Sequence, residues 1–181
     1  MSNYRPITDT WILARAKLKG GQKYYGAYLG GFPERARALL GVTIDDPVLH
    51  VCGGMARAYP YKGGFGPNDA TMDLDPLTEP DYLQDAREPW IIRHDDGPTH
   101  WVSGGTETDA EGWVEEGPAV YKAYLIDPPY SETDAEHYIG GTGASVFPSP
   151  SLLLKRAFEV MEVGQRVGII HYMLPKPPPN A

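Results

Sequence analysis

The sequence predicts an α/β protein whose core is a mostly parallel β-sheet with flanking helices. Short apolar runs, of the length of buried strands, alternate along the 181 residues with two segments of helical period. The 21 glycines and 18 prolines require many turns, so we expect the helices and strands between them to be short. A chain of this length can build one substantial core, and residues 1–181 are expected to form a single domain.

The first half of the chain predicts one helix followed by three strands. The helix begins with Pro33, which suits a first turn, and Gly41 can stop it. The first strand, VLHVC, is apolar and is bounded by turn residues. The second ends at an Asp-Pro pair, and the third is shorter. The expected ranges are helix 33–41 and strands 48–52, 70–76 and 80–86.

The second half predicts a hairpin, an acidic surface segment, a strand, a longer helix and a last strand. The hairpin would turn at Asp96 and Gly97. Ser149 or Ser151 can cap the longer helix, which carries apolar residues at helical spacing and would end at Gly164. The expected ranges are hairpin 89–105, surface segment 106–117, strand 119–126, helix 150–164 and strand 166–174.

Composition indicates a soluble globular protein. Hydrophobic residues make up 41% and charged residues 22%, and no apolar run approaches the length of a membrane span. The first residues show no signal-peptide pattern, and Cys52 is the only cysteine, which suits a reducing cytoplasm. No Cys/His cluster has the spacing of a metal site, so we expect no metal.

The net charge of −8 is unevenly distributed. Residues 1–40 hold seven basic and two acidic residues, whereas residues 45–117 hold four basic and sixteen acidic ones. An acidic chain argues against tight non-specific binding of nucleic acid, which depends on neutralising phosphates. The basic segment can be a solvated surface or a basic rim around one cleft.

The carboxyl end of the strand at 119–126 carries the most specific motif, in AYLIDPPY. In parallel sheets ligands bind beyond the carboxyl ends of the strands. Pro128 and Pro129 fix the backbone and donate no hydrogen bond, but their carbonyls accept. Asp127 and a proline carbonyl therefore form a rigid pair of acceptors that suits an exocyclic amine, and Tyr130 offers a flat face for stacking.

This DPPY sequence resembles the catalytic motif of the S-adenosylmethionine-dependent DNA amino-methyltransferases of the adenine-N6 type. The resemblance extends over about residues 20–175 and implies a Rossmann-like class I methyltransferase fold. It implies transfer of a methyl group to the exocyclic nitrogen of adenine in DNA, with no covalent enzyme intermediate. The residues implied to be catalytic are Asp127, Pro128, Pro129 and Tyr130.

The resemblance also implies that S-adenosylmethionine is the cofactor. VLHVCGG resembles the strand and glycine turn beneath it, although His50 and Cys52 stand where an acid and a phenylalanine are usual. Asp73, with Asp75 as the alternative, would bind the ribose hydroxyls, and Asp85 the adenine amino group. The implied cofactor-binding residues are Lys23, Tyr25, Gly26, His50, Val51, Cys52, Gly53, Gly54, Asp73, Asp85, Ala86 and Asp127.

Simpler roles stand beside several of these assignments. His50 can be a half-buried histidine with satisfied hydrogen bonds, and Cys52 can serve packing. Asp75 can cap a turn, and Asp85 can be a solvent-facing acid. Phe147 can lie over the target base or anchor the start of the helix that follows it.

The expected partner is DNA, with the target base flipped into the site and held by Tyr130 and Phe147. Cytosine, RNA or a protein glutamine remain alternative acceptors, and a non-catalytic cofactor-binding or partner subunit is an alternative of another class.

The stretch between Pro76 and Tyr82 is too short for a crossover helix. The last two strands and the target-recognition region usual in the family are not visible. Three explanations of their absence stay open: the chain is truncated, a partner chain or a second copy covers the exposed sheet edge, or the protein is a minimal variant.

Overall fold

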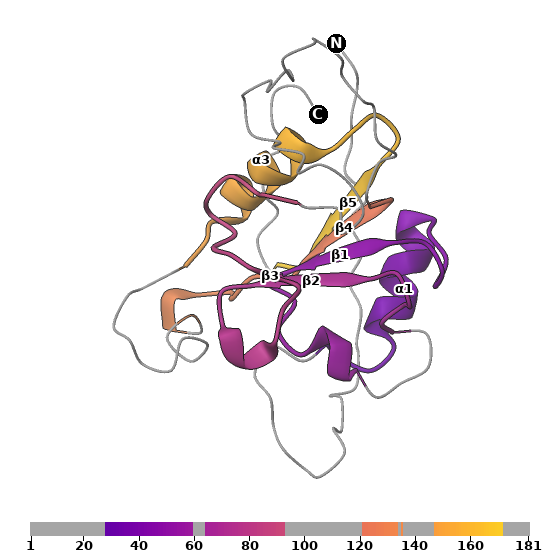
Figure 1. The fold of residues 1–181 in the computed structure, drawn as a ribbon, viewed down its shortest axis with the longest axis horizontal. Helices are drawn as coiled ribbons and strands as arrows, with labels where there is room; N and C mark the ends of the chain where they lie inside the picture. The colour runs from indigo at the N-terminus through magenta and orange to yellow at the C-terminus, as the bar shows by residue number, and fades with distance from the viewer. Residues whose placement is uncertain (1–27, 60–63, 93–120, 134, 136–146, 172–181) are drawn as a thin grey trace, which may run out of the picture.

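The computed structural model describes residues 28–59, 64–92, 121–133, 135 and 147–171. It shows an α/β fold with a five-stranded, all-parallel sheet and flanking helices, as the sequence predicts (Figure 1). The strands are β1 (Val48–Val51), β2 (Ala70–Asp73), β3 (Tyr82–Leu83), β4 (Ala123–Ile126) and β5 (Arg166–Ile169).

The strand order β3-β2-β1-β4-β5 is compatible with a Rossmann-like fold. The chain builds outward from β1 through β2 to β3, and then returns to place β4 on the other side of β1. The direction of building therefore reverses between β1 and β4, where Val51 pairs with Ile126. Ligands of open parallel sheets bind at this reversal, beyond the carboxyl ends of the strands.

Two helices cover opposite faces of the sheet (Figure 1). Helix α1 (Phe32–Leu40) has Pro33 in its first turn, and Gly41 caps its end with φ 62°, a left-handed conformation that glycine adopts without strain. Helix α3 (Pro150–Val160) begins at Ser149, whose side chain accepts a hydrogen bond from the backbone N–H of Leu152. Of the two caps expected for this helix, the structure therefore selects Ser149.

The core consists of two apolar layers, one on each face of the sheet. Leu49 and Val51 point toward α3, whereas Val48 packs with residues of α1, as the alternation along a strand requires. All four residues of β1 are buried, because a central parallel strand is covered on both faces. Within the described ranges, none of the helices combines the length and apolar character needed to cross a bilayer.

Several expected boundaries differ from the structure. Strand β2 ends at Asp73 and not at residue 76, and β4 begins at Ala123, after Tyr121 and Lys122 of the expected strand. Helix α3 ends at Val160 instead of Gly164, because Met161 is extended and packs on the core, and Gly164 (φ 99°) serves the turn before β5. Strand β5 stops at Ile169, and β3 has only two residues. The hairpin expected at 89–105 and the acidic segment at 106–117 lie outside the described residues, apart from 89–92, which form no strand.

The short connection between β2 and β3 is a 3-10 helix, η2 (Pro76–Thr78), and not an α-helix. Parallel pairing is nevertheless achieved, with Met72 opposite Tyr82. The Asp81 carboxylate supports this tight return by accepting hydrogen bonds from the backbone N–H and the hydroxyl of Thr71. Strand β3 therefore lies beside β2 without a crossover helix.

Candidate active site at the carboxyl edge of the sheet

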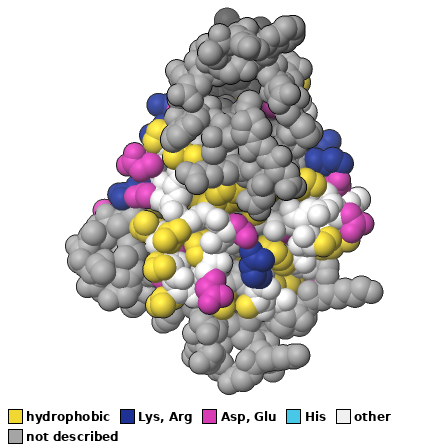
Figure 2. Space-filling view, in the orientation of Figure 1, with side chains coloured by type: hydrophobic (Ala, Val, Ile, Leu, Met, Phe, Trp, Pro, Cys, Tyr) yellow, Lys and Arg dark blue, Asp and Glu magenta, His cyan; other side chains and the backbone are white. Residues whose placement is uncertain are grey.

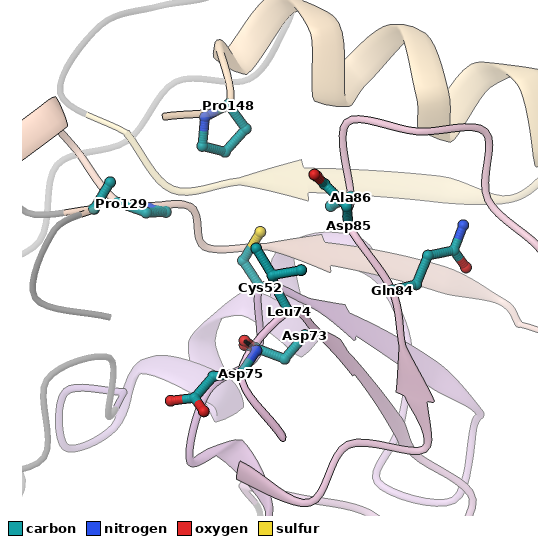
Figure 3. Close-up of a pocket in the computed structure, with 10 residues that line it drawn as sticks. Cys52, Asp73, Leu74, Asp75, Gln84, Asp85, Ala86, Pro129 and Pro148 are labelled. Carbon is teal, nitrogen blue, oxygen red and sulfur yellow. Dashed lines mark hydrogen bonds between the residues drawn. The ribbon is translucent and has the colours of Figure 1, made fainter. Parts of the chain in front are cut away.

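A cleft lies at the carboxyl edge of the sheet, at the ends of β1, β2, β3 and β4 (Figure 3). The space of the cleft, counted out to open solvent, is about 530 Å³. The loops after four different strands meet here because all the strands run in the same direction. The lining residues are Cys52, Asp73, Leu74, Asp75, Gln84, Asp85, Ala86, Pro129, Ala135 and Pro148.

The turn after β1 brings backbone N–H groups to this edge. Cys52 and Gly54 have φ values of 53° and 47°, so the chain turns sharply. The Gly54 N–H donates to Asp73 Oδ2 at 2.8 Å, and this bond ties the turn to the end of β2. Gly53 lies so close to β1 that a Cβ atom there would approach the His50 carbonyl oxygen to 2.8 Å. This position therefore requires glycine.

Asp73, the expected ribose ligand, ends β2 and faces the cleft. Its Oδ1 accepts from the Asp75 N–H at 2.9 Å, and its Oδ2 accepts from Gly54. Burial raises the pKa of Asp73, and the backbone hydrogen bonds offset this in part. Asp75 instead caps η2 by accepting from the Leu77 N–H at 2.9 Å, the turn-capping role considered for it. The geometry therefore favours Asp73 for binding hydroxyl groups.

Asp85 and Ala86 follow β3 and line the opposite side of the cleft. The Arg87 guanidinium donates to both Asp85 oxygens, with Nε at 3.0 Å from each, and these bonds lower the pKa of Asp85. The Ala86 carbonyl accepts from the Trp90 indole at 2.8 Å, which secures the loop on the core. Arg156 of α3 donates to the Arg87 carbonyl at 2.8 Å. Hydrogen bonds at Asp85, Ala86 and Arg87 therefore hold this loop in place.

The Asp-Pro-Pro-Tyr segment continues β4, the strand beside the reversal of strand order. The Asp127 N–H donates to the Val51 carbonyl at 3.0 Å, which extends the pairing of β1 and β4 by one residue. Pro128 is buried, and Pro129 lines the cleft. The Tyr130 hydroxyl donates to Asp127 Oδ1 at 3.0 Å. Burial raises the pKa of Asp127 to about 7, although the bond from Tyr130 acts in the opposite direction.

Cys52 lies close to the carboxyl groups at this edge of the sheet. Its sulfur is directed toward the middle of the lining residues (Figure 3). Burial raises the pKa of its thiol, and the charges of Asp73, Asp127 and Asp85 raise it further. Carboxyl groups from the ends of β2, β3 and β4 therefore act on one thiol.

His50 is not among the residues that line the cleft. Its ring is buried beside α1, with Nε2 3.1 Å from Asp69 Oδ2 and Nδ1 3.0 Å from the Tyr28 hydroxyl. Because the Asp69 carboxylate accepts, Nε2 carries the proton and Nδ1 accepts from Tyr28. The structure therefore shows His50 as a buried histidine with satisfied hydrogen bonds, which is the alternative to cofactor binding considered for it. Val51 likewise points into the core.

Phe147 lies just before α3, at the same edge of the sheet. Its ring centroid is 6.5 Å from that of His171, which in turn lies 5.7 Å from Tyr130. Pro148 follows Phe147 and lines the cleft. Phe147 therefore lies within two ring contacts of Tyr130, and both roles considered for it, contact with the target base and anchoring of the helix start, stay predictions.

Sequence reasoning missed four residues that line the cleft, Leu74, Gln84, Ala135 and Pro148. It also missed Arg87 and His171 at the same edge. Arg87 stands two residues after Asp85, a spacing at which a turn can pair the two side chains. This spacing was the sequence signal that could have predicted the pair. His171 carried no signal, because its neighbours come from other segments. Lys23, Tyr25 and Gly26 lie outside the described residues.

The arrangement combines hydrogen-bond acceptors for hydroxyl and amino groups with a half-buried aspartate beside an aromatic ring. In the part of the chain that the structure describes, no three His, Cys, Asp or Glu side chains gather as a metal-ion site would require. Comparisons with protein-family models, with curated proteins and with solved structures found no match to this chain.

Proposed function

We propose that this protein transfers a methyl group from S-adenosylmethionine to the exocyclic amino group of adenine in DNA. One observation carries the proposal: the Asp-Pro-Pro-Tyr segment stands where the strand order reverses, and its Pro129 lines a cleft formed with Cys52, Asp73 and Asp85. Amine methylation needs both features, a site for the methyl donor and an adjoining pair of acceptors for the amine.

The donor set of the cleft fits S-adenosylmethionine. Asp73 can accept from the ribose hydroxyls, and Asp85 from the adenine amino group while it remains paired with Arg87, since each carboxylate oxygen accepts more than one hydrogen bond. The acidic lining suits the positive sulfonium and ammonium groups. When bound, this cofactor supplies an electrophilic methyl group.

Asp127 and the Pro128 carbonyl would orient the acceptor amine. Each accepts one amine hydrogen, so that the nitrogen lone pair faces the cleft, and the aspartate stabilises the positive charge that develops on nitrogen until the methylated amine releases one proton to solvent. Only ionised Asp127 does this well, and its pKa is about 7. We therefore expect the transfer rate to rise between pH 6 and pH 8, and a flat profile over this range would contradict the role.

On the side drawn in Figure 2, the described residues form no broad basic surface. Acidic, basic and apolar side chains are interspersed there. Within the site, the target base would be recognised by stacking and by hydrogen bonds. An RNA acceptor or cytosine would meet the same acceptors, and the products distinguish them.

The decisive experiment measures cofactor binding and product together. Calorimetry with S-adenosylmethionine should show binding by the full chain that Asp73→Ala and Asp85→Ala each weaken at least tenfold. Incubation with labelled cofactor and DNA, followed by nucleoside mass spectrometry, should give N6-methyladenine. N4-methylcytosine or methylated RNA would reassign the substrate. Binding without transfer to any acceptor would favour the alternative of a non-catalytic cofactor-binding subunit.

A further inference from the structure

Three aromatic rings from separate segments form a row that begins at Tyr130, whose hydroxyl is bonded to Asp127. Tyr130 follows β4, His171 follows β5 and Phe147 precedes α3. The planes of Tyr130 and His171 are inclined at 82° with centroids 5.7 Å apart, an edge-to-face contact. His171 also contacts Phe147, at 6.5 Å and 46°. The imidazole is therefore the ring that the other two share.

Two contacts with described residues constrain Tyr130. Its hydroxyl is bonded to Asp127 Oδ1, and its ring meets the imidazole of His171. The residue is 39% exposed, so the surrounding core alone does not hold it in one rotamer. The hydrogen bond fixes the tip of the side chain, and the contact with His171 fixes the direction of the ring.

We propose that His171 is a positioning residue that holds Tyr130 beside Asp127, so that the two rings and Phe147 form a site for a flat base with an exocyclic amine. The inference rests on the proposed function and names a further residue of that site. Asp127 Oδ1 now accepts from the Tyr130 hydroxyl, and an incoming amine would donate to the same oxygen. When the amine replaces the hydroxyl, the contact with His171 keeps the Tyr130 ring next to the base.

The first test needs no substrate and follows the titration of the Asp127 carboxyl by carbon-13 NMR in the full chain. Tyr130→Phe removes a hydrogen bond that lowers the pKa of Asp127, so it should raise the midpoint. If His171 positions Tyr130, His171→Ala should shift the midpoint in the same direction. His171→Phe, which keeps an aromatic ring, should restore it.

The matched control is Val163→Ser, because Val163 is fully exposed in the turn before β5. It should leave the Asp127 midpoint and the thermal midpoint unchanged. A residue that only packs would lower the thermal midpoint when truncated but leave the Asp127 titration as in wild type. That result for His171→Ala would overturn the inference.

The second test separates binding from chemistry in the methyl-transfer assay. His171→Ala should raise the KM for DNA about tenfold, with a smaller fall in kcat, and it should reduce the fluorescence gain of 2-aminopurine placed at the target base. Unchanged KM and fluorescence would overturn the base-binding role. A wild-type protein that methylates nothing would overturn the proposed function and that role with it, whereas the titration still decides whether His171 positions Tyr130.

Discussion

Asp127 is the residue whose surroundings alter its chemistry most. An aspartate in water is ionised at neutral pH, but burial raises the pKa of Asp127 to about 7. The folded protein thus favours the protonated carboxyl of Asp127, although the role proposed for it, accepting a hydrogen bond from an amine, needs the ionised carboxylate. The sign of the linkage follows: the contribution of the protonated form to stability is present in acid and is lost as the pH rises toward 7.

We therefore predict that Asp127→Asn abolishes methyl transfer and stabilises the protein at pH 8. A neutral amide avoids the cost of burying a charge, so the free energy of unfolding should increase by about 1–3 kcal/mol. Thermal unfolding would show this as a rise in Tm of several degrees. The control Glu132→Gln, an exposed carboxyl near the same segment, should change neither property. Equal or lower stability of Asp127→Asn would contradict the burial argument.

Cys52 gives a second prediction at this scale, since it is the only cysteine and lines the cleft. Burial and nearby carboxylates raise the pKa of its thiol, so alkylation should be slow in the folded chain and fast in denaturant. Saturating S-adenosylhomocysteine should slow it at least tenfold further, as mass spectrometry can measure. The protection should be lost in Asp73→Ala. Labelling that saturating ligand leaves unchanged would mean that the ligand binds elsewhere.

At the scale of elements, the turn after β1 depends on the small size of Gly53. A Cβ atom there would meet the backbone oxygen of His50 at 2.8 Å, whereas one at Gly168 in β5 would make an ordinary contact of 3.4 Å with Leu125. Gly53→Ala should therefore destabilise the protein by about 1–3 kcal/mol. Gly168→Ala should be neutral or stabilising, because alanine restricts the unfolded chain. Urea denaturation compares them, and equal effects would contradict this account.

The elements show what the sequence could predict and what it could not. Apolar runs bounded by turn residues located β1 and β4, because burial on both faces leaves a continuous apolar signal. The position of Asp73 at the end of β2 followed from the same pattern. The end of α3 did not, since the use of Gly164 depends on the turn into β5. The contact of His171 with Tyr130 joins two strands and has no periodic signature.

At the scale of the molecule, a chain of buried polar groups runs along the face beneath α1. Arg37 of α1 pairs with Asp69 before β2, Asp69 with His50 in β1, and His50 with Tyr28. Burial lowers the pKa of His50, against the influence of Asp69. Although its own burial opposes the change, hydrogen bonds from His50 and Arg37 lower the pKa of Asp69. Both groups therefore favour the folded state more as the pH rises.

The corresponding prediction compares wild type with His50→Gln. A histidine held neutral in the folded state contributes stability above about pH 6.5 that is lost as the pH falls, since the unfolded chain then binds a proton. Acidification from pH 7.5 to pH 5.5 should therefore lower the Tm of wild type relative to that of the variant. The variant itself should be less stable at pH 7.5, by about 1–3 kcal/mol, because buried partners lose their hydrogen bonds. Parallel Tm profiles would exclude the linkage.

The order of the strands also determines when the site can form during synthesis. Strands β1, β2 and β3 can pair as soon as the ribosome has released residue 83, but the other edge of β1 stays open until β4 at residues 123–126 has emerged. Asp127 and the ring of His171 are added last, by contacts between residues distant in sequence, which form slowly. A nascent chain therefore exposes the part of the cleft formed by Cys52, Asp73 and Asp85 before the Asp-Pro-Pro-Tyr segment can complete it.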